Sequence, residues 1–250
     1  MATTMTIKRK RITIMSEEQH RITPQALMRQ QSWLSPAFPI GSYSYSHAIE
    51  WAVEARHIQD RTSLVDWLEA DLRYGSGRNE AIFFSQAWSA AVNEDYEGLF
   101  EIAELAAAFR GTSEFALESS QQAAACLATL RAVWPDRILD WLFDTLRQRG
   151  ISPALAVVLG IRSARQGITA SLALAAFLQS YIANLVTAGV RLIPLGQTDG
   201  QLAIAELEEA VLAAGEQTSE CTINDLGSAA FMVDLASMSH ETQYTRLFRS

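Results

Sequence analysis

The longest apolar stretch of the chain runs from Ile168 to Leu195 and reads ITASLALAAFLQSYIANLVTAGVRLIPL. It contains a single charged side chain, Arg191. Apolar residues fall on every face of a helix drawn through it, and such a helix is either buried in a protein core or spans a membrane. Thr169 or Ser171 can cap the start of this helix, and Pro194 must end it because proline has no N–H to donate.

The length of this stretch is sufficient to cross a hydrocarbon core of about 30 Å. However, Gln179, Ser180, Asn184 and Thr187 lie in its middle, and an unpaired polar group is costly in lipid. Alanines spread along the stretch would let neighbouring helices approach closely. We therefore predict a buried central helix, with a transmembrane helix as the alternative.

The rest of the chain shows the spacing of apolar residues that is typical of amphipathic helices. The first such segment, residues 25–35, is predicted to place Ala26, Leu27, Gln30 and Leu34 on one side. No alternating pattern of useful length, which would indicate a strand, is found outside the N-terminal arm. The predicted fold class is all-α, a single-domain bundle of about ten helices around the central buried apolar helix.

Composition and charge restrict the class of protein. The net charge of −8 argues against a general nucleic-acid binder. Cys126 and Cys221 lie far apart and form no CxxC pattern, so we expect no disulfide framework and a cytoplasmic location. Cys126 falls on an apolar helical face and is predicted to be a core thiol.

The N-terminus is predicted to be a flexible arm of residues 1–24. Its basic run, residues 8–11, either contacts an acidic partner or belongs to a solvated tail. The arm has no apolar segment of the kind found in secretory signals. The remaining boundaries are expected at 25–238 for the helical domain and 239–250 for a C-terminal tail.

No catalytic motif is present in the chain, which has no Walker A loop, GxGxxG, HExxH or GxSxG sequence. The four histidines, His20, His47, His57 and His240, are not spaced from each other, or from cysteines and carboxylates, as metal ligands usually are. His47 and Glu50 could share a helix face, where a chance pair in solvent is more common than a metal site. We therefore expect no enzymatic activity, no cofactor and no metal site.

Two stretches combine polar and aromatic residues in the proportions found at protein interfaces. The first, residues 35–51, carries Tyr43, Tyr45 and Trp51 around a turn rich in serine, proline and glycine. The second, residues 237–250, reads SMSHETQYTRLFRS. Each has a structural alternative, which is a corner of the fold for the first stretch and docking onto the chain's own core for the second.

At these stretches the sequence resembles the urease accessory protein UreF family. SPAFPIGSYSYSHAIEWAVEA, residues 35–55, is similar to the family signature S-x-x-L-P-V-G-G-[FY]-S-[YW]-S-Q-G-L-E-W-A-V-E-A. ANLVTAGVRLIPLGQTDGQ, residues 183–201, resembles its second signature, and HETQYTRLFRS, residues 240–250, resembles its C-terminal signature. Three motifs in the expected order across most of the chain make the resemblance specific.

The sequence departs from the family pattern at several positions. Ser42, His47 and Ala48 stand where the first signature has glycine, glutamine and glycine. The arginine- and glutamate-rich helix often found in the middle of family members keeps Glu114 and Glu118 but not its arginines. The resemblance therefore does not by itself assign the family role of that charge cluster to this chain.

The resemblance implies an all-α, UreF-like domain with a non-enzymatic role as a nickel-insertion chaperone. Family members join the accessory protein UreD, called UreH in some organisms, and the GTPase UreG on apo-urease, and they often form homodimers. They modulate GTP hydrolysis during nickel delivery to the enzyme. Neither a nucleic acid nor a membrane is implied as a partner.

The resemblance also implies three groups of partner-binding residues. The corner around Glu50 is expected to support the partner or dimer surface, the central helix to contribute polar contacts beside a channel for the ion, and the tail to insert into the UreD-like protein. Tyr181 and Asn184 have the alternative of a hydrogen-bonded core pair. If Arg191 is buried, it needs a carboxylate or carbonyl partner, whose removal should cost about 3–5 kcal/mol. The complete set is Tyr43, Tyr45, Glu50, Trp51, Tyr181, Asn184, Arg191, His240, Glu241, Gln243, Tyr244, Arg246, Leu247, Phe248 and Arg249.

Two other classes of protein stay open from the residues alone. One is a helical enzyme with an unrecognised carboxylate or histidine site, which turnover by the purified chain would reveal. The other is a membrane protein anchored by residues 168–190, which expression in the soluble fraction without detergent would exclude.

Overall fold

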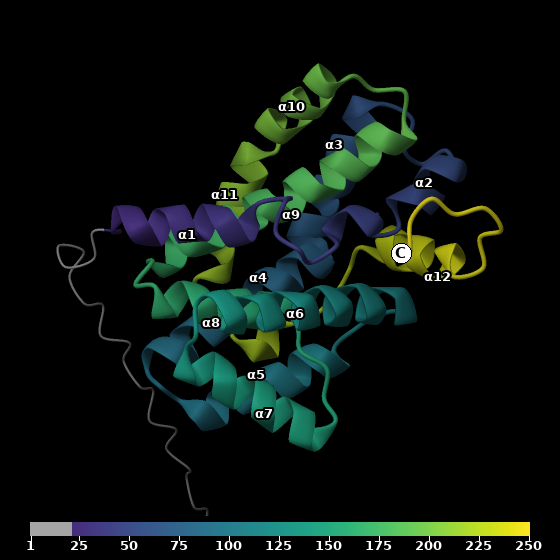
Figure 1. Cartoon of the computed structure of the whole chain (residues 1–250). Coiled ribbons are helices and arrows are strands. Elements are labelled where there is room, and N and C mark those ends of the chain that lie inside the picture. Colours follow the sequence, from purple (N-terminus) through teal and green to yellow (C-terminus); the bar gives the residue numbers. More distant parts are fainter. Residues whose placement is uncertain (1–21) are drawn as a thin grey trace, which may run out of the picture.

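The structure is a computed structural model that describes residues 22–250, and within this range every regular element is a helix. The predicted all-α fold is confirmed (Figure 1). Most of the predicted N-terminal arm lies outside the described residues. The elements are α1 (Pro24–Leu34), η2 (Ser42–Ser44), α2 (Ile49–Glu54), α3 (Arg61–Tyr74), α4 (Ser76–Val92), α5 (Tyr96–Ala108), α6 (Ser113–Val133), α7 (Arg137–Arg149), α8 (Leu155–Arg165), α9 (Ala170–Leu192), α10 (Gln197–Glu206), α11 (Glu208–Thr218), η3 (Ile223–Asp225) and α12 (Phe231–His240).

The apolar stretch forms α9, which begins after Thr169 and ends two residues before Pro194, as predicted. It packs against α1, α2, α3, α4, α8, α10 and α11, and Figure 1 shows it in the middle of the upper part of the molecule. In the described chain, α9 alone is long and apolar enough to cross a membrane, judged by length and composition. Its packing among seven helices identifies it as the central helix of the bundle.

Polar and glycine residues at the helix ends explain where the helices begin and stop. The side chains of Thr23, Asp95 and Thr112 each accept a hydrogen bond from a backbone N–H in the first turn of the following helix. Such caps satisfy donors that have no partner inside the helix. At the end of α7, Gly150 adopts a left-handed conformation with φ of 67°, which glycine accepts without strain.

The buried faces of the helices follow the apolar spacing, with one correction at α1. Ala26 and Gln30 are buried as predicted, and Leu34 is half-buried against the core, but Leu27 is exposed and Trp33 is buried in its place. Trp33 covers more area than leucine, so burying it stabilises the fold more. Cys126 is fully buried, and burial raises the pKa of its thiol to about 12, which confirms a core thiol.

Helices α4 and α8 make the closest pair in the core. A Cβ atom built on Gly160 of α8 would lie 2.5 Å from the carbonyl oxygen of Phe84 in α4, so only glycine fits at this crossing. The Phe84 ring in turn stacks on Phe177 of α9, with 4.9 Å between the ring centroids. The close crossing therefore positions the central helix.

Replacing Gly160 by alanine should lower the free energy of unfolding by about 1–3 kcal/mol because the new methyl group meets backbone that cannot move aside. Urea unfolding of the purified protein measures this. Gly215 of α11 is the matched control, since a Cβ there would meet only Leu174 at an ordinary 3.9 Å. Gly215→Ala should stabilise the helix by about 0.5–1 kcal/mol. Equal effects of the two substitutions would contradict the close approach of α4 and α8.

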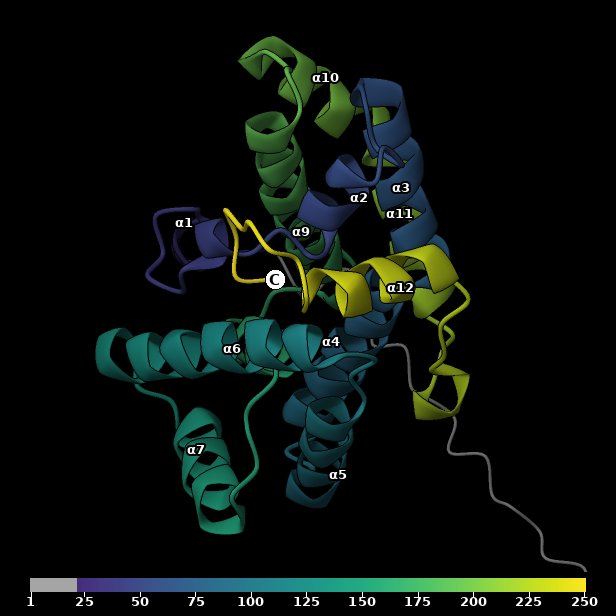
Figure 2. The ribbon, with the colours of Figure 1, turned by 90° about the vertical axis from the view of Figure 1, so that its right-hand side faces the viewer.

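After α12 the chain turns back across the body and ends between α9 and α6 (Figure 2). α12 continues to His240, so the segment predicted as a tail from residue 239 begins inside the last turn of this helix. The C-terminal segment, residues 241–250, is defined here as the chain that follows it.

Candidate partner-binding site

The C-terminal segment is bound by hydrogen bonds to the stretch that precedes α2. The backbone N–H and the hydroxyl of Ser46 both donate to the carbonyl oxygen of Ser250, at 2.7 and 2.6 Å. The N–H of Arg249 donates to the carbonyl oxygen of Ser44 at 2.8 Å. The two interface-like stretches predicted from the sequence therefore lie side by side.

Glu50, in the first turn of α2, organises this contact. Its side chain is buried, and its two carboxylate oxygens accept the backbone N–H groups of Leu247 and Phe248 at 2.6 and 2.9 Å. The oxygen that binds Phe248 also lies 3.1 Å from Nε2 of His240. A carboxylate that accepts several hydrogen bonds is a strong anchor because charged acceptors bind more tightly than neutral ones.

His240 connects this anchor to α6. The side chain is fully buried, and its Nδ1 lies 2.7 Å from a carboxylate oxygen of Glu114. The other oxygen of Glu114 lies 2.8 Å from the guanidinium of Arg246 in the C-terminal segment. The sequence favours a chance pair of Glu50 and His47 on a solvated helix face, but Glu50 is buried and pairs instead with His240, 190 residues away.

Arg191 of α9, which belongs to the second signature segment, contacts both the C-terminal segment and the stretch before α2. Its guanidinium carbon lies 4.4 Å from the centroid of the buried Phe248 ring, and its Nη1 donates to the carbonyl oxygen of Tyr43 at 2.7 Å. The partner is a carbonyl, as expected, but Arg191 itself is exposed, so the cost predicted for a buried arginine does not apply. The Tyr45 hydroxyl donates to Gln121 of α6 at 2.6 Å, which fixes the other side of this corner.

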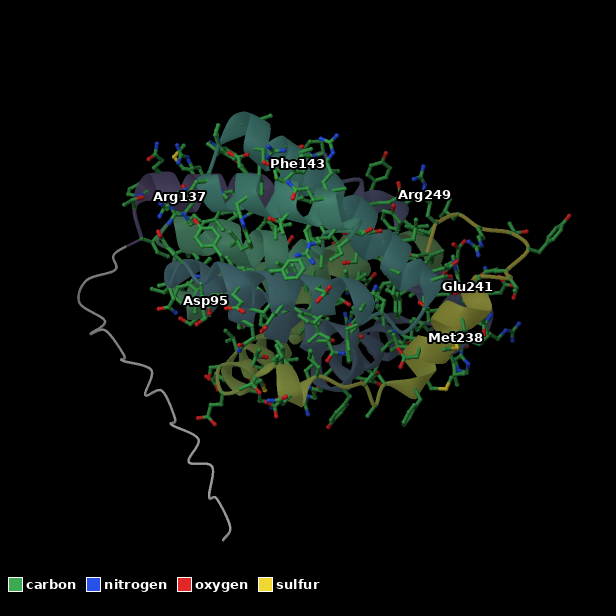
Figure 3. The ribbon with its side chains drawn as sticks, turned by 90° about the horizontal axis from the view of Figure 1, so that it is seen from below. Asp95, Arg137, Phe143, Met238, Glu241 and Arg249 are labelled. Carbon is green, nitrogen blue, oxygen red and sulfur yellow. The ribbon has the colours of Figure 1, made fainter. Side chains whose placement is uncertain are left out.

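Other residues of the predicted set lie outside the contact between the C-terminal segment and the stretch before α2. Trp51 is half-buried against the apolar cluster between α6 and α12. Glu241 accepts a hydrogen bond from the Ser113 hydroxyl at 2.6 Å, and Gln243 donates to Glu54. Figure 3 shows Glu241 and Met238 at the outer edge of α12.

Exposed apolar side chains lie on the C-terminal segment and also on one face of α12. Tyr244 is fully exposed at 101% and Leu247 is 58% exposed. Large apolar side chains rarely gather on a surface that stays in water, so this set of side chains, called the exposed apolar strip here, is a candidate interaction site. We define the strip by Phe231, Leu235, Met238, Tyr244 and Leu247.

Tyr181 and Asn184 of α9 line a cavity of about 350 Å³ beneath this surface. The Tyr181 hydroxyl donates to Asp71 at 2.7 Å, so its partner is a carboxylate of α3. Burial, followed by the charge of Asp71, raises the pKa of Tyr181 well above its ordinary value, and the phenol stays neutral. The remaining cavity wall comes mainly from α1, α4, α6 and α8, from the stretch before α2 and from the turn between α5 and α6.

His47 lies between Glu118 and Ser76, which also line the cavity. Its ring nitrogens are 3.1 Å from Glu118 and 2.6 Å from the Ser76 hydroxyl, and Ser76 donates in turn to Asp71 at 2.8 Å. Burial alone would lower the pKa of His47, but the charge and hydrogen bond of Glu118, helped by Asp71 and Glu80, outweigh it and raise the pKa above the ordinary value.

Because the folded-state pKa of His47 is raised, its protonation stabilises the fold fully below the unfolded pKa of about 6.5 and no longer does so above the folded pKa. We therefore expect the advantage of the wild type over His47→Gln to shrink as the pH rises from about 6 to about 8. Urea unfolding of both proteins at each pH measures this difference. A difference that is constant, or that grows with pH, would show that the carboxylates do not hold the proton on His47.

Several residues of this network were not predicted from the sequence. Asp71 is a carboxylate on the otherwise apolar inner face of α3, beside Leu68 and Leu72, and that placement was the available signal. Glu114 and Glu118 were visible as an i, i+4 pair, but their contacts with α12 and with the stretch before α2 depend on the tertiary fold. In residues 22–250, no group of three histidine, cysteine or acidic side chains is arranged to hold a metal ion.

Comparison with known proteins identifies the family to which this chain belongs. A family model described as UreF matches residues 58–208. The chain is 45% identical over 225 residues to the urease accessory protein UreF of Rhodopseudomonas palustris strain BisB5, covering 90% of this chain and 91% of that protein. The chain belongs to the UreF family. The UreF proteins of Bradyrhizobium diazoefficiens and Granulibacter bethesdensis are 46% and 44% identical, over 90% of this chain and 92% and 94% of theirs.

Family membership confirms the resemblance seen in the three signature segments. The UreF model covers α3 to α10, which includes the whole of α9. The stretch before α2 and the C-terminal segment lie outside residues 58–208. In this UreF family member they join the matched region through Arg191 and Glu114.

Proposed function

We propose that the chain is a non-catalytic urease-maturation scaffold that binds a UreD-like (UreH-like) protein and a UreG-like GTPase on apo-urease. In this role it modulates GTP hydrolysis during nickel delivery, in the cytoplasm and as a monomer or homodimer. The observation that carries the proposal is the convergence of the three signature segments on one surface, next to the exposed apolar strip. The relatives' name, urease accessory protein, supplies the process.

The burial of the residues on this surface supports two different roles, holding the C-terminal segment and contacting a partner. Glu50, His240 and Phe248 are buried and hold the C-terminal segment in place. Tyr244 and Leu247 point their side chains to solvent and are available to a partner. Aromatic and arginine side chains dominate binding energy at protein interfaces, so we assign the partner contact to the exposed strip and to the neighbouring arginines of the segment.

We assign Tyr181 and Asn184 to a different part of the same function. Both line the cavity below the surface, together with the polar groups of His47 and Glu118. Such a cavity offers oxygen and nitrogen atoms to an ion that passes as cargo. Arg191 is not among the residues that line it, and we assign this residue to holding the C-terminal segment.

The test combines a pull-down with an activity assay. The purified chain should retain UreD-like and UreG-like proteins, and its addition should change the rate of GTP hydrolysis by the UreG-like protein in the presence of apo-urease. Retention of neither protein, together with an unchanged GTPase rate, would overturn the proposal. Turnover of a substrate by the purified chain alone would favour the enzyme alternative instead.

A further inference from the structure

A second group of buried polar side chains lies away from the partner-binding surface, where α1 meets α8. Arg162 of α8 is only 2% exposed. Its guanidinium carbon lies 5.3 Å from the ring of Trp33 in α1 and 5.6 Å from the ring of Trp134. The Nη1 group donates to the carbonyl oxygen of Trp134 at 3.3 Å. The two indole rings pack edge-to-face, with 5.9 Å between their centroids, and the guanidinium lies against both of them.

The other donors of this group have no acceptor among residues 22–250. Nε and Nη2 of Arg162, Nε1 of Trp33 and Nε2 of Gln30 are all buried without a hydrogen-bond partner. Gln30 precedes Trp33 by almost one turn on the buried face of α1. Folded proteins satisfy nearly all buried polar groups, and four unsatisfied donors in neighbouring side chains point to an acceptor that occupies this place.

The local charge indicates that this acceptor is an anion. In the described chain no carboxylate forms an ion pair with Arg162, whereas Asp136 pairs with Arg165 at 2.9 Å. Burial, together with Arg29 and Arg165, lowers the pKa of Arg162 to about 10 against the opposing effect of Asp136, so the group is still charged at neutral pH. A buried charge without a counter-ion is costly, and an anion removes that cost.

The free edge of the guanidinium indicates the class of anion. Nε and Nη2 form one edge of the planar group, and their two parallel N–H bonds match the two oxygens of a carboxylate. Because Arg162 is buried, a small ion can reach this edge with less displacement of the surrounding side chains than a large one. We propose that Arg162, with Gln30 and Trp33, binds a small oxyanion of the carboxylate type between α1 and α8. This site is independent of the partner-binding function proposed above.

Thermal unfolding of the full chain in sodium formate, compared with sodium chloride at matched ionic strength, tests the site. The unfolding midpoint should rise by about 2–4 °C more in formate and should saturate with concentration, because a ligand that binds only the folded state stabilises it. Arg162→Met should lose the formate-specific rise while unfolding in chloride at the same temperature as the wild type or higher. Arg73→Met is the matched control, since Arg73 is an exposed arginine paired with Glu69, and should keep the full rise.

A direct measurement covers the case in which Arg162→Met does not fold. Saturation-transfer NMR with formate should detect binding to the wild type, and Gln30→Leu, which removes one donor and keeps the charge, should weaken that binding several-fold. Identical midpoints of the wild type in formate and chloride, together with no transfer to formate, would overturn the proposal. That result would mean that water alone satisfies the donors.

Discussion

We expect Glu50→Ala to lower the free energy of unfolding by about 3–5 kcal/mol, because it removes one partner from a buried, charged network. The substitution leaves the backbone N–H groups of Leu247 and Phe248 without acceptors and leaves one nitrogen of His240 facing an apolar methyl group. The C-terminal segment should therefore detach from the body as well.

Two measurements separate these effects. Urea unfolding gives the loss of stability, and hydrogen exchange of the Leu247 and Phe248 amides reports release of the segment. Glu69→Ala is the control, since Glu69 pairs with Arg73 on the surface and should change stability by less than about 0.5 kcal/mol. If Glu50→Ala were no more destabilising than this control and the two amides stayed protected, Glu50 would not be the anchor of the segment.

The double substitution of Tyr244 and Leu247 by alanine should have a large effect on binding and almost none on folding. Both side chains are exposed, so we expect the free energy of unfolding to change by less than about 0.5 kcal/mol. If they insert into a UreD-like protein, the dissociation constant should rise by about 30-fold or more, since central aromatic contacts commonly contribute 2 kcal/mol or more. Titration calorimetry of the purified proteins measures this.

Phe248→Ala is the contrasting variant, because Phe248 is buried beneath Arg191. It should lower both stability and affinity, since the segment loses its position. Deleting residues 241–250 should abolish co-purification with the UreD-like protein. Undiminished binding by the Tyr244 and Leu247 double variant, or by a folded truncation, would show that the C-terminal segment is not part of the interface.

The central helix could be predicted because its signal is local. A long apolar stretch ended by a proline specifies both a helix and its burial, and α9 has the predicted limits. The inner face of α1 could not be predicted fully. Its polar and apolar residues allow two faces, and the choice of Trp33 over Leu27 depends on Trp134 and Arg162, which lie far away in the sequence.

The site could be predicted in part. The residues of the stretch before α2 and of the C-terminal segment were identified by composition and by family resemblance, but the pairing of Glu50 with His240 joins positions 190 apart. No local pattern encodes such a contact. The sequence left open whether the segment docks onto its own body or onto a partner. In the structure the segment docks onto its own body through the buried Phe248, while Tyr244 stays exposed and accessible to a partner.

Hydrogen exchange of the chain, alone and in complex with a UreD-like protein, tests the central claim most directly. The account predicts added protection in residues 43–51, in α12 and in the C-terminal segment, with α5 and α7 unchanged. A stable complex that protects α5 or α7 and leaves the C-terminal segment unchanged would contradict it.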